Sequence, residues 1–345
     1  MHLVAIDGTG TSRSITEALA AARRGDLVVL DAANHLIDDF ATIDQDIAII
    51  GAGIDATTIT ASRNTTVLSI RGATVTVADL GVTTAYTPGP GEDLFSLLEI
   101  DDGLDVIVDT VVARDGLGNG IGVFQGSTGV IANSLLEGNG ATGVSFDGDS
   151  MMRLLANQAT GNEFSGFAWF GSSSGTALAN YGDQNLEAGF SIRDEGSPTL
   201  ISNDAANNAL SGFIAADQSD PVLRANRSID NDQGGFAWFD VAAGSATGNT
   251  ARGNGTSGFT SQGSSTATWT ANRSSANSFD GFTWFEQAAG LAEGNIGADN
   301  SFDGFAAEDQ TAPTLRRNSA FGNLRNQFFE NGEASPQLFD NDFGS

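Results

Sequence analysis

The sequence Gly-Phe-Ala-Trp-Phe occurs at residues 166–170, recurs unchanged at residues 235–239, and recurs with one difference at residues 281–285. It belongs to a repeat of 23 residues in which glycine followed by an apolar residue returns at a fixed phase. The next step after Gly304 falls on Gln327, where the glycine is lost but an apolar residue follows. Such a strict period identifies the chain as a repeat protein. The glycines of this column are Gly120, Gly143, Gly166, Gly189, Gly212, Gly235, Gly258, Gly281 and Gly304.

Two columns of asparagine keep the same period. Asparagine tolerates the left-handed backbone of a tight turn. Its side-chain amide can also bond to the equivalent amide one repeat away, so we expect two stacked asparagine ladders. The first column is Asn157, Asn180, Asn203, Asn226, Asn249, Asn272, Asn295, Asn318 and Asn341, and the second is Asn139, Asn162, Asn185, Asn208, Asn231, Asn254, Asn277, Asn300 and Asn323.

The repeat unit is typical of short strands separated by turns. In residues 166–170, Phe167 and Trp169 lie on one face of an extended strand, and Ala168 and Phe170 lie on the other. Large residues such as Trp169 alternate with small ones at the equivalent inward position of later repeats, as a closely packed interior requires. Helical repeats are longer, roughly 33 residues or more. Each unit therefore predicts one coil of a parallel β-helix.

The first 115 residues are less regular. Ser14-Ile-Thr-Glu17 forms a capping box that predicts a helix over Ile15–Arg24. We expect this helix to cover the open N-terminal end of the strand stack, because exposed strand edges promote aggregation. Residues 1–115 are thus predicted to form the cap and irregular first coils, and residues 116–345 the regular coils, of one continuous domain.

Residues 14–59 carry a family resemblance. Ser-Ile-Thr-Glu-Ala-Leu, Arg-Gly-Asp-Leu-Val-Val-Leu and Ile-Ala-Ile-Ile-Gly-Ala-Gly-Ile-Asp-Ala-Thr-Thr-Ile resemble the N-terminal cap and first coils of the pectate-lyase-like superfamily. The resemblance implies a right-handed helix, which the chirality of parallel crossovers also favours. We predict an all-β, right-handed parallel β-helix of about 13 to 14 coils. The catalytic motifs of the superfamily's lyases, polygalacturonases and epimerases do not match this sequence, so the resemblance transfers no catalytic residue.

Composition limits the chemistry and the partners. The chain of 345 residues has no cysteine, all of its 15 basic residues are arginine, and its net charge is −28. Disulfides, thiol nucleophiles and lysine Schiff bases are therefore excluded, and nucleic acid is not an expected partner. No apolar run is long enough for insertion into a membrane. The acidic, cysteine-free composition resembles that of bacterial proteins secreted in one step, which favours export without a signal peptide over a cytoplasmic location.

One acidic column carries the candidate catalytic residues. Asp194, Asp217 and Asp240 lie one coil apart, so their Cα atoms should be about 5 and 10 Å apart. Those separations straddle the ranges of retaining and inverting glycoside hydrolases. The alternative is that they are solvated turn residues. We expect no cofactor and no metal site, Ca²⁺ being the one ion that such a column could attract.

An adjacent outward column carries the candidate binding residues Phe170, Arg193, Phe239 and Phe285. Aromatic rings on a surface can stack on sugars, bind a protein, or drive self-association, and the alternative is that they are structural and are covered by another chain or by a folded-over loop. We therefore favour a non-catalytic module that binds a glycan or a protein along this face, in a surface, matrix or adaptor role. The alternative is a carbohydrate-active enzyme, of hydrolase, lyase or epimerase type, that uses the three aspartates.

Overall fold

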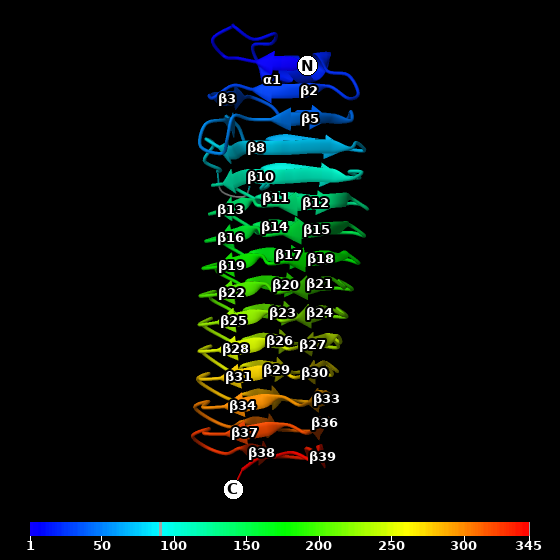
Figure 1. Cartoon of the computed structure of the whole chain (residues 1–345), viewed down its shortest axis with the longest axis vertical. Coiled ribbons are helices and arrows are strands. Elements are labelled where there is room, and N and C mark those ends of the chain that lie inside the picture. Colours follow the sequence, from blue (N-terminus) through cyan, green and yellow to red (C-terminus); the bar gives the residue numbers. More distant parts are fainter. Residues whose placement is uncertain (90–91, 345) are drawn as a thin grey trace. The chain divides into compact units, whose positions relative to one another are not determined.

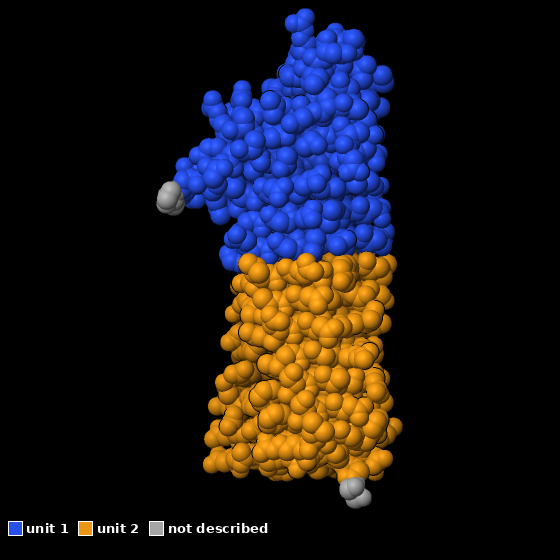
Figure 2. All heavy atoms as spheres, turned by 90° about the vertical axis from the view of Figure 1, so that its left-hand side faces the viewer, with its two compact units in different colours: residues 1–167 blue, residues 168–345 orange. Residues whose placement is uncertain are grey.

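The computed structural model describes residues 1–89 and 92–344 and contains two compact units, Met1–Phe167 and Ala168–Ser345 (Figure 2). The chain is an all-β parallel β-solenoid of about 15 turns with a repeat of about 23 residues. This confirms the predicted fold class, with more turns than the 13 to 14 expected. The coils begin at the first strand, since His2 pairs in parallel with Val28.

Each regular coil contributes two strands to one parallel sheet, sheet A, and one strand to a second, sheet B (Figure 1). In unit 1, sheet A comprises β1 (His2–Val4), β2 (Leu27–Leu30), β3 (Asn34–Ile37), β5 (Ile47–Ile50), β6 (Thr58–Ala61), β8 (Val75–Thr84), β10 (Val106–Arg114), β12 (Thr128–Ala132), β13 (Leu135–Glu137), β15 (Met151–Leu155) and β16 (Gln158–Thr160). Sheet B of unit 1 comprises β4 (Ala41–Ile43), β7 (Leu68–Arg71), β9 (Leu98–Asp101), β11 (Ile121–Phe124) and β14 (Val144–Phe146).

Unit 2 repeats the same coil with little variation. Its sheet A comprises β18 (Ser174–Leu178), β19 (Tyr181–Asp183), β21 (Thr199–Ile201), β22 (Asp204–Ala206), β24 (Val222–Arg224), β25 (Arg227–Ile229), β27 (Ser245–Thr247), β28 (Thr250–Arg252), β30 (Thr268–Thr270), β31 (Arg273–Ser275), β33 (Ala289–Glu293), β34 (Ile296–Ala298), β36 (Ala312–Arg316), β37 (Ser319–Phe321) and β39 (Gln337–Phe339). Its sheet B comprises β17 (Phe167–Trp169), β20 (Phe190–Ile192), β23 (Phe213–Ala215), β26 (Phe236–Trp238), β29 (Phe259–Ser261), β32 (Phe282–Trp284), β35 (Phe305–Ala307) and β38 (Phe328–Glu330).

Helix α1 (Ile15–Ala21) lies at the N-terminal end of unit 1, against β1, β2, β3 and β4 (Figure 1). Ser14 Oγ accepts a hydrogen bond from the Glu17 backbone N–H, and the Glu17 carboxylate accepts one from Arg13 N–H. The predicted cap is therefore present, although the helix ends three residues earlier than expected. Within residues 1–89 and 92–344, no helix has the length and apolar character required to span a membrane.

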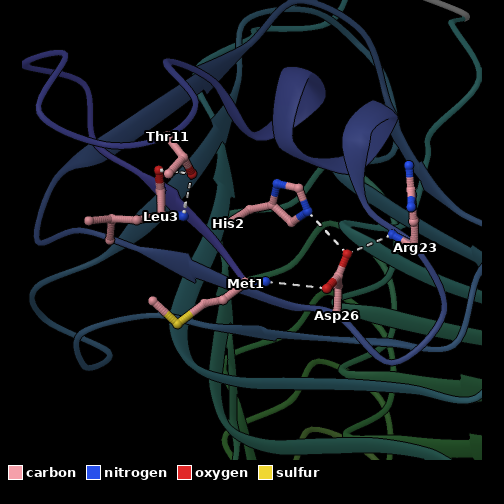
Figure 3. A network of polar contacts seen from close by, with 6 residues as sticks. All are labelled: Met1, His2, Leu3, Thr11, Arg23 and Asp26. Atoms are coloured by element: carbon pink, nitrogen blue, oxygen red, sulfur yellow. Dashed lines mark hydrogen bonds and ion pairs between the residues drawn. The ribbon is translucent and has the colours of Figure 1, made fainter.

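A polar network fixes the first coil beside this helix. The Asp26 carboxylate accepts hydrogen bonds from the Arg23 backbone N–H at 2.9 Å and from the Met1 amine at 3.2 Å, and a third partner, His2 Nε2, lies 3.2 Å away (Figure 3). These contacts, the Arg23 N–H first among them, lower the pKa of Asp26 to about 2. The turn between α1 and β2 is thus held by a charged carboxylate.

The asparagine ladders are confirmed, and they satisfy buried polar groups on the coils that carry them. In unit 2, Asn226 Oδ1 accepts from both the backbone N–H and Nδ2 of Asn203, at 2.8 and 3.0 Å. Asn226 Nδ2 then donates to Asn249 Oδ1 and to the Leu200 carbonyl. Asn226 is fully buried. The turns of successive coils are therefore cross-linked by side-chain amides that both accept and donate hydrogen bonds.

Aromatic rings fill the interior between the sheets of unit 2. The Phe column from Phe190 to Phe305 stacks with ring centroids 4.7 to 4.8 Å apart. Trp238 and Trp284 are buried in the same core, as the alternation of large and small residues predicted. The glycine before each Phe allows sheet B to approach sheet A closely. A Cβ on Gly235 would collide with the Gly258 carbonyl oxygen, which explains the glycine column.

A third ladder runs on the residue before this glycine. Ser257 Oγ accepts the backbone N–H of Asp280, and Asp280 Oδ1 accepts that of Asp303. Both aspartates are almost fully buried, with 4% and 2% of their surface exposed. Burial raises the pKa of Asp280 to about 6, with a smaller contribution from the Asp303 charge one coil away. Two carboxylates thus occupy positions where serine suffices on neighbouring coils.

Candidate functional site

The coils of unit 1 before β9 depart from the 23-residue period, and the step into β9 is among the longest. Leu98 of β9 pairs on one side with Leu68 of β7, which lies 30 residues earlier in the chain. On the other side it pairs with Ile121 of β11, which lies 23 residues later, the regular interval. The additional residues lie in the segment that connects β8 to β9. Figure 2 shows this connection projecting from the body of unit 1. A local insertion of this kind builds a wall beside the outer face of sheet B.

The described part of this connection is held by polar contacts. Asn64 Nδ2 donates to a Glu92 carboxylate oxygen at 3.2 Å and to the Asp93 carbonyl at 2.8 Å. The Tyr86 hydroxyl also donates to the Glu92 carboxylate, at 3.0 Å. This hydrogen bond raises the pKa of Tyr86 above its ordinary value. The wall is therefore attached to the preceding coil and keeps its tyrosine in the hydroxyl form.

Two hollows adjoin each other beside this wall, and together they form what we call the unit 1 groove. Glu99 contributes to both of them. The first, of about 340 Å³, is lined by Asp38, Asp39, Phe40, Arg63, Asn64, Thr65, Thr66, Ser69, Arg71, Phe95 and Glu99. The second, of about 370 Å³, is lined by Glu99, Asp101, Phe124, Gln125, Asp147 and Gly148.

Glu99 is fixed in orientation at the centre of the groove. Arg71, at the end of β7, places Nη2 3.4 Å from Glu99 Oε1. The Arg71 Nε donates to Ser69 Oγ at 3.1 Å, and Ser69 is buried in the groove floor. Thr66 donates to the other Glu99 oxygen at 3.5 Å. A buried hydroxyl therefore holds the guanidinium that orients this carboxylate, an arrangement suited to binding or catalysis.

Asp101 lies two residues after Glu99 on β9, so both side chains face the same side of the sheet. Their Cα atoms are roughly 6.6 Å apart at the usual rise of a strand. Asp101 Oδ1 is buried, and it has no hydrogen-bond partner among the described residues. Inverting glycoside hydrolases place a water between two carboxyl groups, so a carboxylate pair on alternate positions of one strand is a candidate for that chemistry.

The acidic column predicted from sequence lies in unit 2, where its carboxylates accept hydrogen bonds from backbone N–H groups in turns. Asp217 accepts the backbone N–H of Asp194 at 3.1 Å, and Asp240 accepts that of Asp217 at 3.2 Å. All three have positive φ angles of 52 to 59°. Asp194 and Asp217 also border an open hollow of about 450 Å³. The structure thus brings these residues together as turn caps, and their catalytic role stays a prediction.

The described residues include no group of three or more His, Asp or Glu side chains placed to share a metal ion. The three aspartates therefore offer no Ca²⁺ site of that kind in residues 1–89 and 92–344. Each presents its carboxylate to a backbone N–H of the preceding coil instead.

The aromatic column of unit 2 is half-buried. Phe170, Phe239 and Phe285 all lie partly covered on the outer face of sheet B. Phe239 packs with Leu210 against a small cluster of Ala188, Ile214 and Ala216. The column is therefore partly a structural patch, in line with the alternative that these rings are covered. Arg193 lies along the same face and donates from Nε to Ser191 Oγ at 3.3 Å.

Comparison with known proteins supports the fold. Residues 117–274 match the protein family described as right handed beta helix region. The chain is a right-handed parallel β-helix. Its structural neighbours have the pectate-lyase-like fold, so the resemblance seen in residues 14–59 is confirmed for the fold. No curated protein matches the sequence of this chain.

Solved structures similar to this chain include carbohydrate-active enzymes of low sequence identity. The periplasmic alginate epimerase AlgG is 12% identical, with a TM-score of 0.66 over 96% of this chain and 83% of that one. The mannuronan C-5 epimerase AlgE6 A-module of Azotobacter vinelandii is 15% identical, with a TM-score of 0.59 over 96% and 93%. The catalytic unit of a GH87 alpha-1,3-glucanase from Streptomyces thermodiastaticus strain HF3-3 is 14% identical, with a TM-score of 0.60 over 96% and 66%. This likeness concerns the fold.

Proposed function

We propose that the protein is a carbohydrate-active enzyme that hydrolyses a glycan in the unit 1 groove. The observation that carries this proposal is the pair Glu99 and Asp101, which face one groove from alternate positions of β9. Arg71 orients the first, and the insertion before β9 supplies a wall. The similar solved structures are enzymes that act on polysaccharides, which supports the enzyme hypothesis over the purely binding one.

In the proposed reaction the two carboxyl groups act as an acid and a base. One, in its acid form, gives a proton to the glycosidic oxygen as the bond from C1 to that oxygen breaks. The other takes a proton from a water molecule, whose oxygen forms the new bond to C1. Arg71 and Ser69 hold Glu99 in place for this step. The products are two shorter glycans, one of which carries a new reducing end.

The test measures reducing ends released from a panel of polysaccharides. Glu99→Gln and Asp101→Asn should each lower the rate by about 10² to 10⁴-fold while thermal unfolding stays unchanged. Asp217→Asn is the matched control, since its carboxylate lies in a turn of unit 2. Activity lost in Asp217→Asn but kept in Glu99→Gln would assign catalysis to the column of Asp194, Asp217 and Asp240 instead.

The partly covered aromatics of unit 2 support a second candidate function. Phe239 retains exposed surface beside Phe170 and Phe285 along one face, as a non-catalytic module that binds a glycan or protein would require. A glycan array and light scattering test this candidate. Phe239→Ser should abolish binding, or convert a dimer to a monomer if the face serves self-association. Unchanged binding and unchanged mass would reject it.

A further inference from the structure

The charges that line the unit 1 groove distinguish between classes of glycan. Five carboxylates border it, from Asp38, Asp39, Glu99, Asp101 and Asp147. Two guanidinium groups lie among them. Arg71 is already occupied by Glu99 and Ser69. Among the lining residues that the structure describes, Arg63 is thus left as the cation without an ion-pair partner.

This excess of negative charge in the groove disfavours the binding of a polyuronate. Such a polymer carries a carboxylate on every sugar, and clustered charge of one sign repels ligands of the same sign. The whole chain carries a net charge of −28, which adds to the repulsion at low ionic strength. A single unpaired arginine at one end of the groove does not compensate for a row of ligand carboxylates.

Aromatic side chains border the same groove. Phe40 and Phe95 have 48% and 44% of their surface exposed, and Phe124 is half-buried at the end of β11. From β4 to β11 the groove crosses three coil steps, or roughly 14 Å. The apolar faces of neutral sugar rings stack on aromatic rings of this kind. An uncharged sugar ring has an apolar face and a rim of hydroxyl groups. The exposed phenylalanines can contact the apolar face, and the carboxylates beside them can contact the hydroxyl groups.

The carboxylates also suit a neutral sugar chemically. An ionised carboxylate accepts hydrogen bonds and donates none. Sugar hydroxyls can donate to it, and bonds to a charged acceptor are stronger than neutral ones. A uronate group, being itself an acceptor without a proton, cannot make such a bond. Three carboxylates of the groove can therefore accept hydrogen bonds from sugar hydroxyl groups, namely those of Asp39, Asp147 and the oriented Glu99.

We infer that the glycan of the unit 1 groove is an uncharged polysaccharide whose rings stack on Phe40, Phe95 and Phe124. This inference rests on the proposed function, because it takes the same groove as the substrate site. It predicts a substrate unlike that named for the alginate epimerases with similar folds.

The experiment measures binding of hexasaccharides by calorimetry, using the full chain with Glu99→Gln to prevent turnover. The probes are neutral hexose and pentose oligomers, with mannuronate and galacturonate oligomers of equal length. A neutral oligomer should bind at least tenfold more tightly than either uronate, with less than twofold change between 50 and 500 mM salt. Phe95→Ala and Phe124→Ala should each weaken it at least tenfold, while Phe279→Ala, an exposed ring of unit 2, should not.

The outcomes separate this inference from the proposed function. A uronate bound most tightly, with binding lost in Arg63→Ala and at high salt, would overturn the uncharged substrate while leaving a Glu99-dependent enzyme intact. A neutral glycan bound with the expected Phe dependence, but never cleaved by the wild-type protein, would keep the inference and reject hydrolysis. Binding to none of the probes would reject both.

Discussion

Replacing Asn226 by alanine tests whether the asparagine ladder holds the coils together. The substitution removes the acceptor of the Asn203 backbone N–H, which then lies buried without a partner at a cost of about 1–3 kcal/mol. Asn203 Nδ2 and the Leu200 carbonyl each lose one hydrogen bond, at about 0.5–1.5 kcal/mol apiece. Together these losses predict that the free energy of unfolding falls by about 4 kcal/mol.

Guanidinium denaturation followed by circular dichroism measures this change. The control is Thr247→Ala, an exposed position of β27 beside the same ladder, for which a change within about 0.5 kcal/mol is expected. The midpoint of Asn226→Ala should fall while the slope of the transition stays constant. A difference from the control below about 1 kcal/mol would refute the argument that these buried amides stabilise the stack.

Three further predictions concern the core and the buried acids of unit 2. Trp238→Ala should cost about 3–5 kcal/mol, measured in the same denaturation assay, because the indole is fully buried. Gly235→Ala should cost about 1–3 kcal/mol, since its Cβ would meet the Gly258 carbonyl oxygen, whereas Thr247→Ala should not. Because burial raises the folded-state pKa of Asp280 to about 6, the folded chain binds the proton more tightly than the unfolded chain. Stability should therefore fall as pH rises from about 4 through 6, and Asp280→Ser should remove that slope; an unchanged slope in a series of thermal melts would reject the assignment.

The repeated part of the fold could be predicted from sequence because stacking gives every coil the same environment. Asn203 and Asn226 make equivalent hydrogen bonds, and those bonds require the same residue at the same position of each repeat. The same holds for Phe213 and Phe236, whose rings stack at 4.7 Å. The N-terminal helix was also predicted from its capping box, but the prediction extended it by three residues, since Ala22 leaves the helical conformation.

The candidate groove could not be predicted in this way, for the same physical reason. Glu99 and Asp101 belong to a coil whose insertion breaks the period, so they form no column in the sequence. The available signal was the 30-residue step from Leu68 to Leu98, which requires knowing which residues begin each strand. Conversely, the regular phase of Asp217 reflects a turn contact repeated on neighbouring coils. In this chain, strict periodicity marks structural contacts, and the candidate site lies beside one of the longest departures from it.

The most direct test of the account is a crystal structure of the Glu99→Gln protein with a neutral hexasaccharide. The account predicts sugar rings in the unit 1 groove, stacked on Phe95 and Phe124, with a glycosidic oxygen within hydrogen-bond distance of Asp101 or of the residue at 99. A saccharide seated instead on the Phe239 face of unit 2, with the unit 1 groove free of sugar, would contradict it.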